Sequence, residues 1–233
     1  MINLTLVIPC YNEKDNLPLL IKNISKLDKN LKFIIIENGS SDDSRTYLQA
    51  EEKNLNSNIS VFYIENNEGY GKGVYEGLLS VENSDFIGWL HGDLQFEFDK
   101  LNELISKLND FSSKHEKVFY KGIRTGRSIL ERFISQFMGI IASKFLGYKF
   151  REINAQPTIF SKELILEFNN PPNDFRFDTY VYWLAMKNEY IVFREHFDFP
   201  PREYGNSKWN FGIKSRLIFS YNLIKYFNYL KKI

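Results

Sequence analysis

Three polar side chains at alternate positions, His91, Asp93 and Gln95, follow an apolar run at residues 86–90. An apolar run that stops abruptly at polar residues is typical of a buried parallel strand ending at a functional edge. An imidazole, a carboxylate and an amide at this spacing could share one metal ion, or the carboxylate alone could hold a phosphate-bound metal. The residues alone leave both kinds of metal site open, and the question is which ligand reaches this strand end.

The elements that would position this site are short apolar strands separated by helices. Apolar, β-branched runs lie at residues 4–8, 33–36, 59–64 and 86–90, and segments of helical periodicity, such as residues 74–81, separate them. This alternation predicts an α/β fold with a mostly parallel sheet and helices on both faces. Ligands of such sheets bind outside the carboxyl ends of the strands, so the four polar segments that follow these strands should converge on one crevice.

Composition excludes several other classes of protein. The chain has 233 residues, is 43% hydrophobic and 25% charged, and suits one large domain or a domain with an appended arm. Its net charge of +1 argues against general nucleic-acid binding. The single cysteine, Cys10, excludes an internal disulfide and a cysteine-based zinc site. Without a signal-peptide pattern or a run of 18 apolar residues, we expect a cytoplasmic protein.

Two of the strand-end segments have ordinary explanations when each is taken alone. The glycine-rich stretch at residues 69–73 could approach phosphate oxygens closely, but it lacks the glycine spacing of a P-loop and could be a plain turn. The acidic stretch at residues 37–43 could be no more than a turn and a helix cap.

The four segments together are more specific than any one of them. VIPCYNE at residues 7–13, ENGSSD at 37–42, NEGYGKG at 67–73 and GDLQ at 92–95 occur in this order at strand ends. They resemble the inverting, GT-A-fold glycosyltransferases of family 2, and within them the polyprenyl-phosphate branch typified by dolichyl-phosphate mannose synthase. The resemblance implies a Rossmann-like GT-A sheet, a nucleotide-diphosphate sugar donor and a divalent metal, Mg²⁺ or Mn²⁺. It also implies a lipid-phosphate or glycan acceptor.

The resemblance also implies roles for individual residues of this sequence. Nucleotide-sugar contacts would come from Pro9, Tyr11, Asn12, Glu13, Glu37, Asn67, Gly69, Lys72, Gly92 and Asp93. Glu37 stands where the family usually has Asp, so the carboxylate is kept with one extra methylene. Asp93 is the second acid of the family's Asp-x-Asp motif, and Gln95 matches the glutamine that follows in the polyprenyl branch.

The main departure from the family pattern is His91, which replaces the first acid of that motif. Imidazole is a poorer ligand than carboxylate for Mg²⁺ but an acceptable one for Mn²⁺. His91 could therefore bind the metal together with Asp93 and Gln95, or hydrogen-bond the ribose or a phosphate. It could also merely end the strand, in which case the chain would be a nucleotide-sugar-binding protein with impaired turnover.

The second half offers candidates for catalysis. A predicted strand at residues 118–120 leads into Lys121, Arg124 and Arg127, whose charges suit a phosphate unless they form a solvated basic loop. Asp178, at the start of a predicted helix, is either an N-cap or the general base for the acceptor. A phosphate acceptor would need no strong base, because it is already anionic.

The last part of the chain suggests a further phosphate contact and a membrane contact. Residues 202–208 resemble the Arg-x-x-Gly-x-Ser-Lys segment of polyprenyl-phosphate transferases, so Arg202 and Lys208 would close over the diphosphate. We expect a GT-A domain at residues 1–204 and a basic, aromatic, amphipathic helical arm at 205–233. The arm could contact the inner face of a membrane, pack on the domain or form a dimer contact, and the oligomeric state stays open. The apolar helix predicted at residues 128–147 could likewise lie at a membrane interface or in the core.

Overall fold

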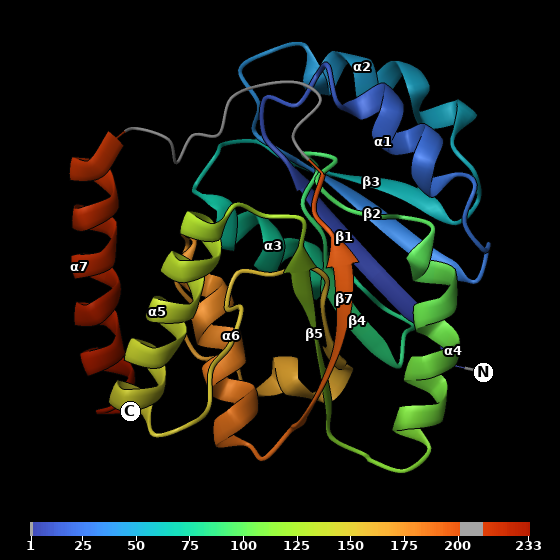
Figure 1. The fold of residues 1–233 in the computed structure, drawn as a ribbon. Coiled ribbons are helices and arrows are strands. Elements are labelled where there is room, and N and C mark those ends of the chain that lie inside the picture. Colours follow the sequence, from blue (N-terminus) through green and yellow to red (C-terminus); the bar gives the residue numbers. More distant parts are fainter. Residues whose placement is uncertain (1, 201–211) are drawn as a thin grey trace.

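A seven-stranded sheet with helices on both faces forms the centre of the computed structural model, which describes residues 2–200 and 212–233 (Figure 1). The strands are β1 (Leu4–Cys10), β2 (Leu31–Asn38), β3 (Ile59–Ile64), β4 (Phe86–Trp89), β5 (Val118–Thr125), β6 (Thr158–Ser161) and β7 (Ile191–Asp198). Their order is β3-β2-β1-β4-β6-β5-β7. Strand β6 runs antiparallel to both of its neighbours, and the other neighbouring pairs are parallel. The predicted α/β fold with a mostly parallel sheet is confirmed.

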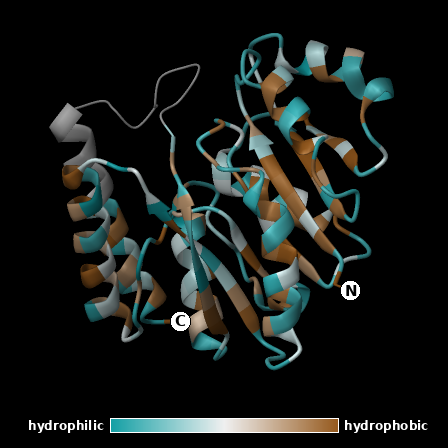
Figure 2. Ribbon diagram, turned by 45° about the vertical axis from the view of Figure 1, so that its right-hand side comes forward, coloured by the Kyte–Doolittle hydropathy of each residue, from teal (hydrophilic) through white to brown (hydrophobic). Residues whose placement is uncertain are grey.

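Two hydrophobic cores lie on opposite faces of this sheet. The helices are α1 (Leu17–Ile24), α2 (Ser44–Glu51), α3 (Tyr70–Leu79), α4 (Lys100–Ser112), α5 (Ile129–Leu146), α6 (Arg176–Lys187) and α7 (Gly212–Leu230), with short 3-10 turns η1 (Glu52–Asn54) and η2 (Lys162–Glu167). Helices α1, α2 and α4 cover one core, and α3, α5, α6 and α7 cover the other. Strand β1 alternates between them, with Leu6 and Ile8 in the first core and Val7 in the second. The strands are largely hydrophobic and the loops between elements largely hydrophilic (Figure 2).

The glycine-rich stretch begins α3 rather than forming a plain turn, and only Gly69 precedes the helix, with a φ of 117°. A Cβ atom at Gly71 would lie 2.3 Å from the carbonyl oxygen of Pro172, and one at Gly73 would lie 2.6 Å from the side chain of Asn38. The missing side chains therefore let the first turn of α3 approach other parts of the protein. Glycine disfavours helices, which explains why the sequence pattern delays the predicted start to residue 74.

The basic segment that follows the predicted strand at 118–120 is largely strand rather than loop. Strand β5 continues to Thr125 because it pairs with β7 along its whole length, from Val118 opposite Ile191 to Thr125 opposite Asp198. Lys121 is consequently a strand residue with a fully buried side chain. Arg124 lies near the carboxyl end of the same strand.

Helix α5 matches the helix predicted at residues 128–147. Ser128 and Glu131 form a reciprocal capping box at its start, and Gly147 ends it with a φ of 79°. The helix turns its small residues Gly139 and Ala142 inward. Large apolar side chains of its first three turns face outward, each at least 40% exposed: Ile129, Leu130, Phe133, Ile134, Phe137 and Ile140. Leu146, near its end, is buried in the core.

The C-terminal helix α7 packs on the domain through its second half. Leu223, Tyr226, Phe227 and Leu230 are buried in the core that α3, α5 and α6 share. The expected boundary at residues 204 and 205 lies outside the described residues. Within the described part of the chain, no helix is both long and apolar enough to span a bilayer.

Candidate functional site

A pocket of about 340 Å³ lies at the carboxyl ends of β1, β2 and β4, where the sequence predicts a crevice. Its walls come from the loops after these strands, from the start of α3 and from the residue before α6. The lining residues are Pro9, Tyr11, Glu13, Asn38, Asn67, Gly69, Tyr70, His91, Gly92, Asp93 and Phe175. Segments far apart in the sequence therefore meet in one cavity.

The loops after β1 and β2 are tied together by hydrogen bonds. The side-chain oxygen of Asn12 accepts a bond of 2.8 Å from the backbone N–H of Ser41, and the backbone N–H of Asn12 donates to Ser40 Oγ at 3.1 Å. The backbone N–H of Glu13 donates to Ser44 Oγ at 3.1 Å. Asn12 thus joins the two loops beside the pocket, whereas Tyr11 and Glu13 line it.

Glu37 is fully buried and holds the second loop from inside. One carboxylate oxygen accepts from the backbone N–H of Ser40 and the other from Arg45 Nε, each at 2.7 Å. Arg45 extends this ion pair to Glu65 at 3.1 Å. The predicted contact of Glu37 with the base or ribose stays a prediction, because the contacts observed here are internal. Its neighbour Asn38 lines the pocket instead.

The segment before α3 is anchored to β2 by Asn67. Its side-chain amide donates to the carbonyl oxygen of Asn38 at 2.8 Å and accepts from the backbone N–H of Gly69 at 3.0 Å. Lys72 lies one turn into α3, where its ammonium group pairs with Glu76 at 2.6 Å. Asn67 and Gly69 line the pocket, and Lys72 is not among the lining residues.

His91, Asp93 and Gln95 follow β4, but their side chains do not form one cluster of three ligands. His91 Nδ1 lies 4.0 Å from Asp93 Oδ2. The amide of Gln95 turns elsewhere and donates to the carbonyl oxygen of Pro200 at 3.0 Å. No group of three histidine, cysteine or acidic side chains suited to a metal occurs among the described residues. Metal binding by Gln95 stays a prediction, since its amide contacts Pro200 in this arrangement.

His91 and Asp93 nevertheless fit a divalent metal that takes its remaining ligands from a diphosphate and water. Asp93 is 6% exposed, and its carboxylate faces the same cavity as the imidazole. Mg²⁺ and similar cations often bind through one or two protein groups plus substrate phosphates. Two protein donors at the wall of a pocket match that mode of binding.

Two aromatic residues complete the wall of the pocket beside His91. The rings of Tyr70 and Phe175 stack with centroids 4.4 Å apart and planes at 7°. The Tyr70 hydroxyl lies 3.1 Å from His91 Nε2. This contact fixes the side chain that replaces the family's first acid.

A buried ion pair lies in the core on the same face as Tyr70. Lys121 Nζ is 3.7 Å from Asp178 Oδ1 and donates to Thr158 Oγ1 at 2.7 Å. Burial lowers the pKa of Lys121 to about 8, against the opposing effect of the Asp178 charge. Burial also raises the pKa of Tyr70, and the charge of Asp178 raises it further.

Asp178 is not the helix cap that its position suggests. The N-cap of α6 is Phe175, and no side chain caps the helix. Asp178 lies within the first turn, is 2% exposed and does not line the pocket. Its role as general base stays a prediction.

The remaining predicted cations lie apart from the pocket or outside the described residues. Arg124 Nε pairs with Glu152 at 2.8 Å, and Arg127 reaches the same carboxylate at 3.6 Å. The guanidinium group of Arg124 also lies 5.5 Å from the ring centroid of Phe199. Arg202 and Lys208 belong to the part of the chain that the structure does not describe.

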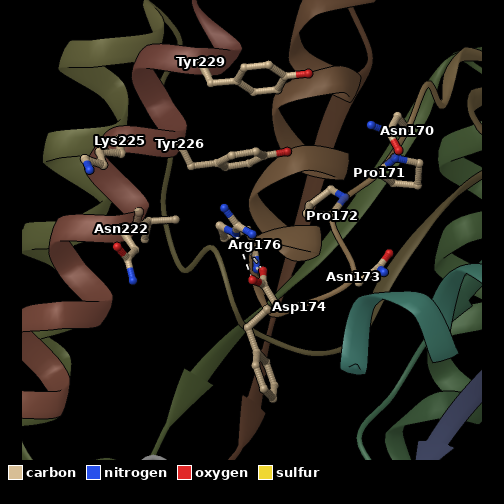
Figure 3. A pocket seen from close by; sticks show the side chains of 12 residues that line it. Asn170, Pro171, Pro172, Asn173, Asp174, Arg176, Asn222, Lys225, Tyr226 and Tyr229 are labelled. Carbon is tan, nitrogen blue, oxygen red and sulfur yellow. Dashed lines mark hydrogen bonds and ion pairs between the residues drawn. The ribbon is translucent and has the colours of Figure 1, made fainter. Parts of the chain in front are cut away.

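A second, wider cavity of about 800 Å³ separates residues 170–176 from α7 (Figure 3). Tyr226 and Tyr229 project into it from α7, with Asn222 and Lys225 on the same helix. Arg176 pairs with Asp174 at 2.8 Å and lies 5.1 Å from the ring centroid of Tyr226. Phe175 lines both cavities, so the two are neighbours.

Comparison with known proteins identifies the family. The sequence model of glycosyl transferase family 2 matches residues 5–168, which include all the strand-end segments of the pocket. The chain belongs to this family. It is therefore a glycosyltransferase, and the predicted family resemblance is confirmed.

Curated relatives of the glycosyltransferase are distant. An uncharacterised protein of Methanocaldococcus jannaschii is 27% identical over 170 residues, which cover 68% of this chain and 72% of that protein. The undecaprenyl-phosphate 4-deoxy-4-formamido-L-arabinose transferase of Yersinia enterocolitica is 33% identical over 106 residues, which cover 44% of this chain. That match spans 32% of the Yersinia protein, so the chain corresponds to about a third of it.

Solved structures show the same fold. Glucosyl-3-phosphoglycerate synthase from Mycobacterium tuberculosis, in complex with Mn²⁺, uridine diphosphate and phosphoglyceric acid, has a TM-score of 0.70 at 15% identity. The similarity covers 96% of this chain and 78% of that one. The complex of the same synthase with Mn²⁺ and uridine-diphosphate-glucose has a TM-score of 0.68 at 15% identity, covering 94% and 77% of the two chains.

The glycosyltransferase pocket contains residues that sequence reasoning missed. Asn38 follows Glu37 in a quoted motif, and Tyr70 lies within the quoted glycine-rich stretch, so both had a local signal. Phe175 had no local sequence signal, because only the tertiary fold stacks its ring on that of Tyr70.

Proposed function

We propose that the glycosyltransferase moves a sugar, with inversion at the anomeric carbon, from a nucleotide-diphosphate sugar to a polyprenyl-phosphate or glycan acceptor. A divalent metal, Mn²⁺ or Mg²⁺, would assist the transfer. The observation that carries the proposal is the convergence of four strand-end loops on one pocket whose wall holds Asp93 and His91. The printed names of the relatives support it, since they include an undecaprenyl-phosphate sugar transferase and a synthase bound to Mn²⁺ and uridine diphosphate.

The nucleotide would occupy the 340 Å³ pocket. Pro9, Tyr11 and Glu13 would line the base and ribose on one side, held by the hydrogen bonds between the first two loops. Asn67, Gly69 and Gly92 would lie close to the nucleotide on the other side.

The diphosphate would lie against Asp93 and His91. When bound there, a metal supplies charge that stabilises the departing nucleotide diphosphate. Arg202 and Lys208 would add cationic charge at the same place. The acceptor oxygen forms a bond to the anomeric carbon from the opposite face while the bond to the diphosphate oxygen breaks, which inverts the configuration.

The acceptor would approach past Phe175 from the wider cavity. That cavity combines tyrosine rings with Arg176 and Lys225, which suit hydroxyl-rich or phosphate-bearing groups. A phosphate acceptor carries its own negative charge and needs no strong base. The position of Asp178 agrees with such an acceptor, because this residue is buried and paired with Lys121 rather than placed in the pocket wall.

The protein would work in the cytoplasm, at the inner face of a membrane, where a polyprenyl-phosphate acceptor would be anchored. The exposed apolar side chains of α5 support this location, because they form a continuous face along the helix. Arg132 and Lys144 flank that face with positive charge.

Nucleotide binding by an Asp93→Ala variant tests the proposal. In isothermal titration calorimetry we expect the wild-type protein to bind UDP or GDP in the presence of Mn²⁺. Asp93→Ala should lose the metal-dependent part of that affinity, about tenfold to a hundredfold, because the remaining carboxylate contact to the metal is gone. Asp110→Ala, which removes a carboxylate that is 72% exposed on α4, is the matched control and should bind as the wild type does.

Undiminished metal-dependent binding in Asp93→Ala would refute the site assignment. Transfer assays with prenyl phosphate and glycan acceptors, with the product anomer read by NMR, test the acceptor class and the inversion. Nucleotide-sugar binding without transfer or donor hydrolysis would favour the alternative function, a binding protein with impaired turnover.

A further inference from the structure

His91 is held in one ring orientation by two neighbours on the same side. Its Nε2 lies 3.1 Å from the Tyr70 hydroxyl and 3.0 Å from the side-chain oxygen of Gln156. Only one orientation of the Gln156 amide satisfies all its partners. In that orientation the nitrogen donates to the carbonyl oxygen of Trp89 at 2.6 Å, and the oxygen also accepts from Trp89 Nε1 at 3.0 Å.

These contacts determine which nitrogen of a neutral His91 carries the proton. An amide oxygen only accepts hydrogen bonds, so His91 Nε2 must be the protonated nitrogen that donates to it. The lone pair of the neutral ring is then on Nδ1. That atom lies 4.0 Å from Oδ2 of Asp93, and both residues line the pocket.

We propose that His91 binds the metal through Nδ1, together with Asp93, and that this makes the site selective for Mn²⁺ over Mg²⁺. The inference rests on the proposed function, because it concerns the metal of the nucleotide-sugar site. Tyr70 and Gln156 are positioning residues, since they act on the metal only through the tautomer and orientation of His91.

The two groups are close enough to become a pair of ligands. Adjacent donors of an octahedral site that each lie about 2.1 Å from the metal are about 3.0 Å apart. The observed 4.0 Å between Nδ1 and Oδ2 would therefore shorten by about 1 Å when the metal binds, which a small movement of the side chains can supply. Ligand type then sets the selectivity: Mg²⁺ prefers oxygen donors, while an imidazole nitrogen is better tolerated by transition metals such as Mn²⁺.

Pulsed EPR of Mn²⁺ bound to the full chain with UDP tests the inference. Electron spin echo modulation should show coupling to an imidazole ¹⁴N in the wild type and none in His91→Asp, which restores two acids. Competition titrations should show the preference for Mn²⁺ over Mg²⁺ fall about tenfold or more in His91→Asp. His196→Asp, which changes an exposed histidine on β7, is the matched control and should leave both readouts unchanged.

A second measurement needs neither a variant nor a metal. The ¹⁵N chemical shifts of His91 in the metal-free protein should show a protonated Nε2 and an unprotonated Nδ1. The opposite tautomer would overturn the inference, and so would Mn²⁺ that binds with UDP but shows no ¹⁴N coupling. In the latter case the proposed function would stand. A wild-type protein that binds no Mn²⁺ in the presence of UDP would overturn the inference and the proposed function together.

Discussion

Lys121 is a cation in a segment where the sequence suggests either a phosphate contact or a solvated basic loop. Its side chain is fully buried, and its partners are Asp178 at 3.7 Å and Thr158 at 2.7 Å. Burial of a charge costs free energy that one partner only partly offsets, which is why the pKa of Lys121 falls to about 8. The ion pair lies beside the aromatic wall of the pocket rather than in contact with the donor.

This lowered pKa predicts how stability changes with pH. Below pH 8 Lys121 is protonated in both the folded and the unfolded chain, and the cost of burying its charge is fully present. Between about pH 8 and 10.5 the unfolded chain binds more protons than the folded one, so the free energy of unfolding rises with pH. The gain should reach up to about 3 kcal/mol, since each pKa unit corresponds to about 1.4 kcal/mol.

Urea denaturation of the wild type and of Lys121→Met across this pH range measures the effect. The variant removes the titrating group but keeps every tyrosine, so the difference between the two proteins isolates Lys121. The free energy of unfolding of the wild type minus that of Lys121→Met should increase from pH 8 to pH 10.5. A difference that stays constant with pH would show that Lys121 is not held at a lowered pKa.

Among the secondary-structure elements, α3 shows how tertiary contacts override a local pattern. Its first turn contains glycines because the chain at Pro172 and Asp174 passes where side chains would otherwise lie. The same close approach places Phe175 on Tyr70. The glycines in the first turn of this helix therefore serve the packing of the pocket wall.

Replacement of Gly71 by alanine should destabilise the protein although alanine favours helices. The new Cβ would lie 2.3 Å and 2.7 Å from two backbone oxygens, those of Pro172 and Asp174, which cannot easily move. Overpacking of this kind typically costs about 1–3 kcal/mol. Gly77→Ala in the same helix is the matched control, because its Cβ would mainly meet the end of the Ile36 side chain, which can shift. Urea denaturation should rank Gly71→Ala as the less stable, and the reverse order would contradict the packing argument.

Strand and helix patterns were sufficient to predict the sheet, the crevice and the loops that line it. Apolar runs marked β1 to β4, and the polar residues after them marked the loops, because alternating burial and strand ends leave local signals. Elements set by distant contacts left no such signal: β5 continues through Lys121 because β7 pairs with it, and Phe175 reaches the pocket only through α6. The role of Gln156 and the pairing of Asp178 with Lys121 were missed for the same reason, since the partners of these residues lie on other elements.

At the scale of the whole molecule, the side formed by α5 exposes many large apolar side chains. Helices α5 and α7 lie next to each other on the face of the sheet opposite α1, α2 and α4 (Figure 1). The outer side of α5 carries large apolar side chains over most of its length, while its inner side buries Gly139, Ala142 and Leu146. A helix that buries Gly139 and Ala142 but exposes Phe133 and Phe137 is suited to contact with an apolar environment such as a membrane interface.

Liposome flotation tests whether the exposed apolar face of α5 binds a membrane. The wild-type protein should float with vesicles that contain anionic lipids, because the apolar side chains insert at the interface and the flanking Arg132 and Lys144 meet negative headgroups. Phe133→Ser combined with Phe137→Ser should weaken this partition at least about tenfold, since the loss of two phenylalanine rings from an apolar environment exceeds 1.4 kcal/mol. Leu79→Ser combined with Leu166→Ser removes side chains that are 52% and 82% exposed elsewhere and should float as the wild type does. Equal flotation of both double variants, or a wild type that never floats, would remove the membrane from the proposed function. The donor pocket would be unaffected, because none of these four residues lines it.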